Sequence, residues 1–148
     1  MADILLVEDN PDDAELALQA LRRNDLKTEV FVAKDGQGAL DYLFSAASVT
    51  GTSPHNLPLL ILLDLNLPYI GGLDVLKKIR SSEITRHVPV VILTTSDDEY
   101  AIRSAYELGA NSLIKKSTDF DQFVQAMRQI NDYWLGFNIA KEHDKVFV

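Results

Sequence analysis

Leu59-Leu60-Ile61-Leu62-Leu63-Asp64-Leu65-Asn66-Leu67-Pro68 is an apolar run that ends in an acidic residue and a turn. The apolar residues before Asp64 are too few for a helix and do not alternate with polar ones, so they predict a strand that is buried on both faces of a sheet. Asp64 then lies at the carboxyl end of that strand, where open parallel sheets bind ligands. Capping of the turn that Pro68 closes would explain an isolated aspartate, but Asp64 is not isolated.

A second short apolar run, Ile4 to Val7, leads directly into the acidic pair Glu8-Asp9. The residues that follow have the composition of a helix start: Asn10 as the capping side chain, Pro11 in the first turn, and Asp12-Asp13 near the positive end of the helix dipole. Helix formation therefore explains residues 10–13. It leaves Glu8-Asp9 as a second acidic group at the end of a buried strand.

Strand and helix patterns alternate through the rest of the chain. We predict strands at 28–33, 88–93 and 113–114, and helices that begin near residues 35, 72, 97 and 117, with Ser96 as a cap and a polar connection at 45–58. The last helix has the clearest apolar stripe, interpreted as core: Phe120, Phe123, Val124, Met127, Ile130 and Trp134. Repeated strand–helix units predict an α/β fold, a parallel sheet covered on both faces with right-handed connections.

Polar side chains follow four of these strands: Glu8-Asp9, Asp64 with Asn66, Thr94, and Lys116. Because parallel strands end at one edge of the sheet, these groups should lie close together. Clustered carboxylates require raised pKa values or a bound cation, and oxygen ligands without histidine or thiolate favour Mg²⁺. A lysine and a hydroxyl beside Mg²⁺ suit phosphoryl transfer. Since the sequence has no nucleotide-binding loop, the phosphoryl group must come from another molecule, with Asp64 as its nucleophile.

The composition narrows the classes of function. The chain contains no cysteine, which excludes disulfides, thiol catalysis and thiolate zinc sites. Its net charge of −8 argues against binding to nucleic acid or to an anionic membrane. The N-terminus has no basic segment before an apolar one, and no apolar stretch reaches membrane-spanning length, so we expect a cytoplasmic protein.

In their order and spacing, these residues together with Gly72 resemble the receiver domains of two-component response regulators. The resemblance covers about residues 3–135 and implies a flavodoxin-like, doubly wound fold with sheet order 2-1-3-4-5. It implies that Asp64 accepts a phosphoryl group from a histidine kinase. It further implies roles for other positions: Glu8, Asp9, Asp64 and the backbone carbonyl of Asn66 hold Mg²⁺, Thr94 and Lys116 contact the phosphoryl oxygens, and Asn66 and Ser96 tune dephosphorylation.

Within this family, the sequence is similar to single-domain regulators that partner phytochrome histidine kinases of cyanobacteria and other bacteria. The runs 63–68, 93–96 and 133–135 carry this narrower likeness, together with the long connection before the central strand. Three positions depart from the family pattern. Thr95 stands where the family usually has a smaller residue, which would narrow access to the site. Leu113 stands where most receivers have the aromatic residue of their phosphorylation switch. Ser117 follows Lys116 where most have proline, often after a cis bond that would cost about 2.5–4 kcal/mol before serine.

Two alternatives come from other classes of function. One is a phosphohydrolase with an aspartyl nucleophile, but Asn66 stands where such enzymes of the haloacid dehalogenase type need a second acid. The other is a receiver-like module that binds partners without being phosphorylated, and the complete set of site residues argues against it. We expect a phosphoacceptor that catalyses only its own phosphotransfer and slow autodephosphorylation, not an enzyme.

The receiver domain is expected to span residues 1–135, followed by a C-terminal tail at 136–148 with apolar residues such as Phe137 and Ile139. A tail this short cannot form a core of its own, so it must pack on this domain or on another chain. Receivers commonly pair through the face of the fourth helix, fifth strand and fifth helix, which adjoins the tail. We therefore expect a homodimer in which each tail reaches across to its partner, with a tail folded onto its own helix as the alternative.

Overall fold

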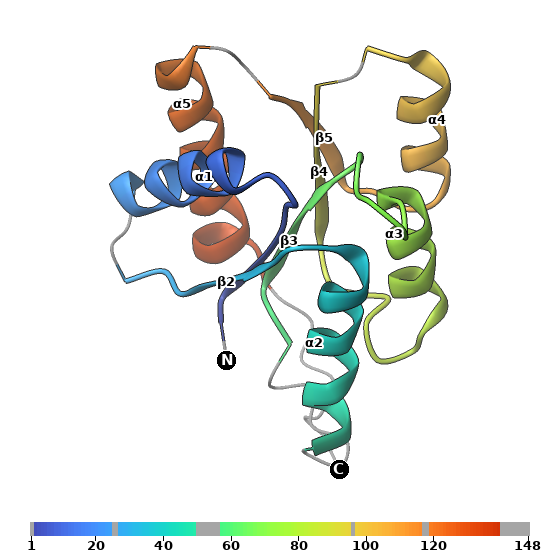
Figure 1. The fold of residues 1–148 in the computed structure, drawn as a ribbon. Coiled ribbons are helices and arrows are strands. Elements are labelled where there is room, and N and C mark those ends of the chain that lie inside the picture. The colour runs from blue at the N-terminus through green and yellow to red at the C-terminus, as the bar shows by residue number, and fades with distance from the viewer. Residues whose placement is uncertain (1, 25–26, 50–56, 96, 117–118, 140–148) are drawn as a thin grey trace.

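The computed structural model of the chain describes residues 2–24, 27–49, 57–95, 97–116 and 119–139. Strands and helices alternate along these residues as predicted (Figure 1). Their bounds are β1 Ile4–Val7, α1 Pro11–Asn24, β2 Val30–Ala33, α2 Gly36–Val49, β3 Leu60–Asp64, α3 Gly72–Ser81, β4 Val90–Thr94, α4 Glu99–Glu107, β5 Ser112–Lys115 and α5 Phe120–Asn131. A π-helix, η2 (Asp132–Phe137), continues from α5.

The strands form one five-stranded sheet in the order β2-β1-β3-β4-β5, and every neighbouring pair is parallel. All residues of β1, β3 and β4 are buried, as their unbroken apolar runs predicted. The edge strand β2 is only partly buried, which fits its alternating sequence. The predicted α/β class, the sheet order and the central position of β3 are therefore confirmed.

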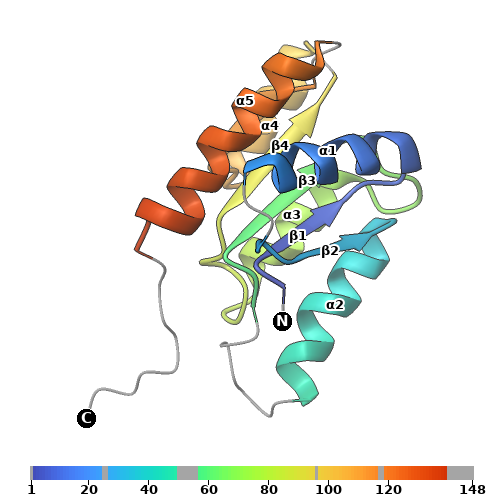
Figure 2. The same cartoon turned by 90° about the vertical axis from the view of Figure 1, so that its left-hand side faces the viewer.

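The helices cover both faces of the sheet (Figure 2). Helices α1 and α5 lie on one face and contact each other, whereas α2, α3 and α4 cover the other. Because side chains alternate along a strand, Ile4 and Leu6 of β1 belong to the apolar cluster under α1 and α5, and Leu5 and Val7 belong to the cluster under the other helices. These two apolar clusters, one on each face of the sheet, thus hold the carboxyl ends of the strands in fixed relative positions.

The second helix is longer than predicted. Helix α2 continues to Val49, so the polar connection predicted from residue 45 begins too early. The segment 45–49 reads Ser-Ala-Ala-Ser-Val, and its small residues resemble a loop in composition although alanine is the residue best suited to a helix. Residues 50–56 of the predicted connection lie outside the described residues.

The start of α4 also differs from the prediction. Its N-cap is Asp98, whose side chain accepts a hydrogen bond from the backbone N–H of Tyr100 at 2.9 Å. The prediction that Ser96 caps this helix is therefore wrong. Ser96 itself, with its predicted role beside the site, lies outside the described residues.

The chain remains helical beyond the predicted domain boundary. Regular α-helix ends at Asn131, and η2 continues the winding to Phe137, so residue 136 falls inside this π-helix and not at its end. Trp134 packs against the cluster under α1 and α5 and is partly buried, as the stripe predicted. Residues 140–148 of the expected tail are outside the described part of the chain.

A partly buried arginine, Arg80, ties together the segments at the amino ends of β4 and β5, on the side of the sheet away from the carboxyl ends of the strands. Arg80 of α3 donates hydrogen bonds to the carbonyl oxygens of Gly109 (2.9 Å), Val88 (2.7 Å) and Arg86 (3.1 Å), and to Oδ1 of Asn111 (2.9 Å). Burial lowers the pKa of Arg80 from its usual value. These bonds tie α3 to the turn after α4, and the sequence analysis did not predict them.

No helix within the described ranges is both long and apolar enough to cross a membrane. None of the described peptide bonds is cis, and the bond between Lys116 and Ser117 lies outside those residues.

Candidate functional site

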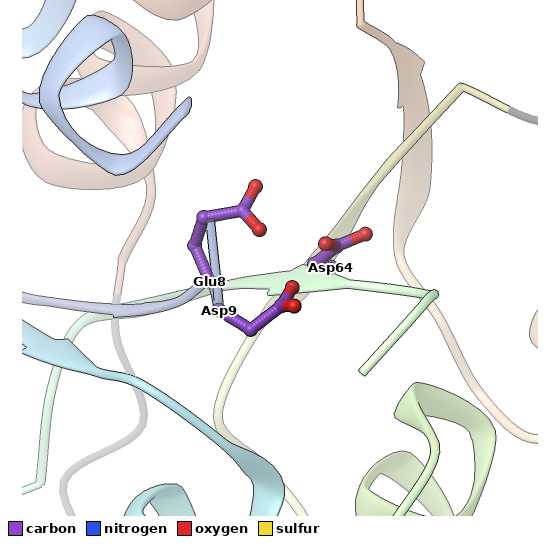
Figure 3. A group of neighbouring side chains, drawn as sticks. All are labelled: Glu8, Asp9 and Asp64. Atoms are coloured by element: carbon purple, nitrogen blue, oxygen red, sulfur yellow. The ribbon is translucent and has the colours of Figure 1, made fainter. Parts of the chain in front are cut away.

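Three acidic side chains meet at the carboxyl edge of the sheet (Figure 3). Glu8 and Asp9 directly follow β1, and Asp64 is the last residue of β3, which pairs with β1. One carboxylate oxygen from each side chain lies within 4.8 Å of the other two. Glu8 and Asp64 are buried and Asp9 is exposed, so the cluster is accessible to solvent from the side of Asp9.

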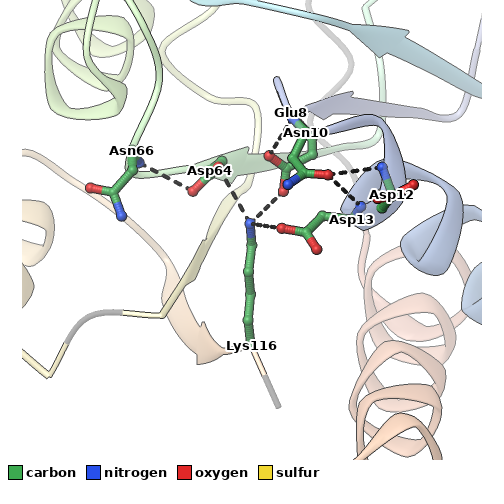
Figure 4. Close-up of polar contacts among 7 residues, drawn as sticks. All are labelled: Glu8, Asn10, Asp12, Asp13, Asp64, Asn66 and Lys116. Carbon is green, nitrogen blue, oxygen red and sulfur yellow. Dashed lines mark hydrogen bonds and ion pairs between the residues drawn. The ribbon is translucent and has the colours of Figure 1, made fainter. Parts of the chain in front are cut away.

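The ammonium group of Lys116 reaches this cluster from the end of β5 (Figure 4). Its Nζ donates a hydrogen bond to Oε1 of Glu8 and lies 3.3 Å from Oδ2 of Asp64 and 3.4 Å from Oδ2 of Asp13. The Lys116 side chain is only 15% exposed, so these contacts are screened by water much less than a surface ion pair. The Lys116 ammonium thus connects acidic groups that lie directly after β1, in α1 and at the end of β3.

Thr94 ends β4 and is buried, with 2% of its surface exposed. Its carbonyl oxygen accepts a hydrogen bond of 2.7 Å from the backbone N–H of Lys116. Because β4 and β5 pair Thr94 with Lys115, this bond extends the strand contact by one residue. It fixes the backbone from which the Lys116 side chain reaches Asp64.

The turn after β1 orients Glu8 through the helix cap. Oδ1 of Asn10 accepts hydrogen bonds from the N–H groups of Asp12 (2.9 Å) and Asp13 (3.2 Å), which confirms the predicted cap. The backbone N–H of Asn10 donates in turn to Oε2 of Glu8 at 3.3 Å. The start of α1 and the position of the Glu8 carboxylate are therefore set by the same few residues.

The loop after β3 orients Asp64 in a similar way. The backbone N–H of Asn66 donates to Oδ1 of Asp64 at 3.1 Å, and Oδ2 is the oxygen on the side of Lys116. The side chain of Asn66 is exposed. Each carboxylate oxygen of Asp64 thus has a different neighbour.

The electrostatics of the site depend on burial. Burial raises the pKa of Glu8 to about 7, and the hydrogen bond with Asp64 and its charge act in the same direction, while Lys116 opposes them. For Lys116 burial favours the neutral amine, but the hydrogen bond to Glu8 and the nearby carboxylates outweigh it and raise its pKa. The metal-free site therefore holds more carboxyl groups than its one lysine can neutralise, which is the situation that a divalent cation relieves.

The structure brings together the predicted residues Glu8, Asp9, Asp64 and Lys116, with Thr94 at the neighbouring strand end. Leu113, at the position of the usual aromatic switch, is partly buried against the apolar cluster under α2, α3 and α4.

Sequence reasoning missed Asp13, which it explained only by the helix dipole. Helix α1 begins at Pro11, soon after β1 ends, so the third residue of its first turn lies beside the strand end. The short stretch of sequence between β1 and α1 was the signal that could have placed Asp13 beside the site.

Comparison with known proteins identifies the class. The sequence pattern of the response regulator receiver domain matches residues 4–128, so the chain belongs to this family. It is 39% identical over 135 residues to the probable methanogenesis regulatory protein FilR2 of Methanothrix harundinacea, covering 91% of this chain and 84% of FilR2. It is 36% identical over 132 residues to the response regulator Rcp1 of Synechocystis, covering 89% of this chain and 88% of Rcp1.

Solved structures agree with this class. The phosphorylated cyanobacterial phytochrome response regulator RcpA superimposes with a TM-score of 0.84 at 37% identity, covering 95% of this chain and 99% of RcpA. The Mn²⁺-bound form of Rcp1 superimposes with a TM-score of 0.81 at 32% identity, covering 95% of this chain and 99% of that structure. The chain is therefore a receiver homologous to phytochrome response regulators, and one of these, Rcp1, has been solved with Mn²⁺ bound.

Proposed function

We propose that this chain is a single-domain response regulator that accepts a phosphoryl group on Asp64 from a histidine kinase, with Mg²⁺ as cofactor. The observation that carries the proposal is the meeting of Glu8, Asp9 and Asp64 with the Lys116 ammonium at one edge of the sheet. Among the described residues, the potential metal ligands that meet there are carboxylate oxygens, which suit Mg²⁺. The carboxylates of Glu8, Asp9 and Asp64, with the backbone carbonyl of Asn66, would hold the ion, which would neutralise charge on the phosphoryl oxygens.

The residues of the chain have distinct proposed roles. A carboxylate oxygen of Asp64 forms the new O–P bond while the P–N bond to the donor histidine breaks and the imidazole leaves. Lys116 donates to a phosphoryl oxygen, and its existing distance of 3.3 Å to Asp64 Oδ2 means that little movement is needed. Thr94, beside it, contacts a second phosphoryl oxygen through its hydroxyl. Asn66 and Ser96 modulate the access of water to the acyl phosphate.

The proposed donor is a bacterial phytochrome histidine kinase, because RcpA is a phytochrome response regulator and resembles this chain along nearly its whole length. We propose a cytoplasmic signalling protein that acts through protein contacts and does not turn over external substrates. The charge of −8 argues against nucleic acid as its target. With Leu113 in place of the aromatic switch, the phosphorylation signal must reach the surface without rotation of a ring at that position.

Labelling by a small phosphodonor tests the function. Acetyl phosphate with Mg²⁺ should add one phosphoryl group per chain, seen by intact mass, and excess chelator should prevent it. A burst without continued release of phosphate supports a phosphoacceptor, whereas steady turnover would support the phosphohydrolase alternative. Absence of label in Mg²⁺ would support the binding module. Transfer from a panel of autophosphorylated histidine kinases, bacterial phytochromes included, then identifies the donor.

Magnesium affinity should rise between about pH 6 and pH 8. The pKa of Glu8 in the metal-free protein is about 7, so its carboxyl must lose a proton before it can face the ion. Calorimetry in two buffers with different ionisation heats should detect proton release near pH 7, and Glu8→Gln should remove it. Proton release that persists in the Glu8→Gln variant would assign the titration to another group.

The raised pKa of Glu8 also affects the stability of the metal-free protein, but stability changes with pH in the direction opposite to magnesium affinity. Between about pH 4.5 and pH 7 the folded chain keeps a proton on Glu8 that the unfolded chain has released. Metal-free stability should therefore fall as the pH rises through this window, and urea unfolding at several pH values measures the trend.

The proposal includes a homodimer through the C-terminal region. Tyr133 and Phe137 of η2 and the following Ile139 are 51%, 78% and 94% exposed, so three large apolar residues close together in the sequence are available for contact with another chain. We retain residues 1–135 as the receiver and 136–148 as the dimerisation arm. Light scattering of the full chain and of a form ending at Leu135 tests this: a dimer that becomes a monomer on truncation is expected, and a truncated form that stays equally dimeric would place the interface elsewhere.

A further inference from the structure

Tyr69, five positions after Asp64 in the loop between β3 and α3, has two unusual features. Its side chain is 98% exposed, the highest value among the exposed large hydrophobic residues of the described chain. Its φ is 65°, and no other non-glycine residue in the described ranges has a positive φ. A bulky residue in this left-handed conformation is strained, and an aromatic ring that stays in water contributes no hydrophobic free energy to folding. Neither feature helps the free protein to fold.

The strain is not the result of a loose loop. Leu67 and Ile70, on either side of Tyr69, pack against the apolar cluster under α2, α3 and α4. The loop closes with a hydrogen bond of 3.1 Å from the N–H of Gly72 to the carbonyl of Leu65. The chain therefore presents the Tyr69 ring to solvent from a fixed backbone, and a partner that binds the ring pays little for ordering it.

The position of the loop indicates what kind of partner would meet the ring. The loop leaves β3 at the edge of the sheet where the acidic cluster lies (Figure 1), so a protein that delivers a phosphoryl group to Asp64 must cover this edge. The same edge carries the acidic side chains of Asp9, Asp12 and Asp13, which attract a basic surface. A tyrosine ring at the margin of such a surface can stack on an arginine or lysine side chain, and tyrosine is enriched among the residues that dominate binding energy.

We propose that Tyr69 is a specificity-determining anchor for the protein phosphodonor, stacking on a basic side chain that flanks the donor histidine of the kinase. The inference rests on the proposed function of Asp64. Tyr69 does not touch the reacting atoms. It sets how fast a protein donor transfers its phosphoryl group and has no effect on a small donor, which needs no docking surface.

The test uses three substitutions of Tyr69 in the full chain with one control. Tyr69→Asn and Tyr69→Gly remove the ring and tolerate a positive φ, so they keep the shape of the loop. Tyr69→Phe keeps the ring. Tyr106→Ala is the matched control, because Tyr106 is also exposed but lies near the C-terminal end of α4, at the opposite edge of the sheet. Each variant is measured for thermal midpoint, labelling rate with acetyl phosphate and Mg²⁺, and transfer rate from the autophosphorylated kinase that phosphorylates the parent fastest.

The expected pattern separates recognition from folding. Relief of strain should raise the thermal midpoint of Tyr69→Asn and Tyr69→Gly by about 2–4 °C. Their labelling by acetyl phosphate should match the parent, while transfer from the kinase should slow by about tenfold. Tyr69→Phe and Tyr106→Ala should transfer at the parental rate.

Four results would overturn the assignment. Kinase transfer that is unaffected in Tyr69→Asn and Tyr69→Gly would mean that the ring is not an anchor. A lower thermal midpoint in both would make Tyr69 a structural residue. Equal slowing with acetyl phosphate and kinase would mean that it acts on the chemistry at Asp64. A parent that acetyl phosphate labels but no kinase does would also refute the anchor, whereas a parent that acetyl phosphate fails to label would refute the function of Asp64 itself.

Discussion

The Asp64→Asn variant is expected to take up no phosphoryl group, where the parent takes up one. Asp64 is the buried carboxylate at the end of β3, and its Oδ2 lies 3.3 Å from the Lys116 ammonium. An asparagine fills nearly the same volume and preserves most of the packing, but its amide is a poor nucleophile and carries no charge for a metal ion. Intact mass after treatment with acetyl phosphate and Mg²⁺ measures the difference.

Asp12→Asn is the control for this substitution. Asp12 is an exposed acid at the same edge of the sheet, near the N-terminus of α1, and its change removes the same charge without touching the acidic cluster. It should be labelled like the parent. A phosphoryl group on the Asp64→Asn variant would move the acceptor to another residue, and peptide mapping would then locate it.

The same variant gives a second, independent readout. Burial is the largest cause of the raised pKa of Glu8. Asp64 adds to it through a hydrogen bond and through its charge. In the Asp64→Asn variant the pKa of Glu8 should therefore fall from about 7 toward its ordinary value. NMR titration of the glutamate carboxyl carbon checks this, and an unchanged pKa would mean that burial alone determines it.

The sequence predicted the sheet and most of the acidic cluster because both follow from simple patterns. Short unbroken apolar runs mark strands that are covered on both faces, and alternation with helices makes such strands parallel. Once the strands are parallel, the residues that follow them share one edge of the sheet. Glu8, Asp64 and Lys116 therefore meet although 108 positions separate the first from the last.

What the sequence did not reveal depends on distances between elements or on backbone angles. The role of Asp13 depends on how close the first turn of α1 lies to Lys116, which a pattern of charges cannot give. The hydrogen bonds of Arg80 join segments that lie far apart in the chain. The positive φ of Tyr69 is imposed by the packing of its neighbours and contradicts the preference of the residue itself.

Helix ends were the least predictable feature, since they reflect small differences in free energy. Segment 45–49 is helical although its composition is close to that of a loop. At the other end of the chain, η2 follows α5 without a break, because its residues continue the apolar contact with the cluster under α1 and α5 through Trp134 and Leu135.

Gly72→Ala is expected to be the most destabilising of the substitutions considered. Gly72 is the first residue of α3, and a Cβ there would lie 2.4 Å from the carbonyl oxygen of Asp64 and 2.8 Å from Cα of Leu65. Both atoms belong to the backbone and cannot move aside alone, so α3 must shift away from the end of β3. Overpacking of this kind costs about 3 kcal/mol.

Gly71→Ala is the matched control, one residue earlier in the chain. Gly71 has a φ of −68°, and the nearest atom to an added Cβ is Oδ2 of Asp74, at 4.0 Å. An alanine fits there, and the slightly poorer N-cap should cost less than about 1 kcal/mol. Urea unfolding measures both variants. Because the displaced carbonyl belongs to Asp64, the fraction of Gly72→Ala that remains folded should also be labelled more slowly by acetyl phosphate than Gly71→Ala. Equal unfolding midpoints for the two variants would show that α3 can move away from β3 at no cost, and that the close packing of Gly72 does not hold Asp64 in place.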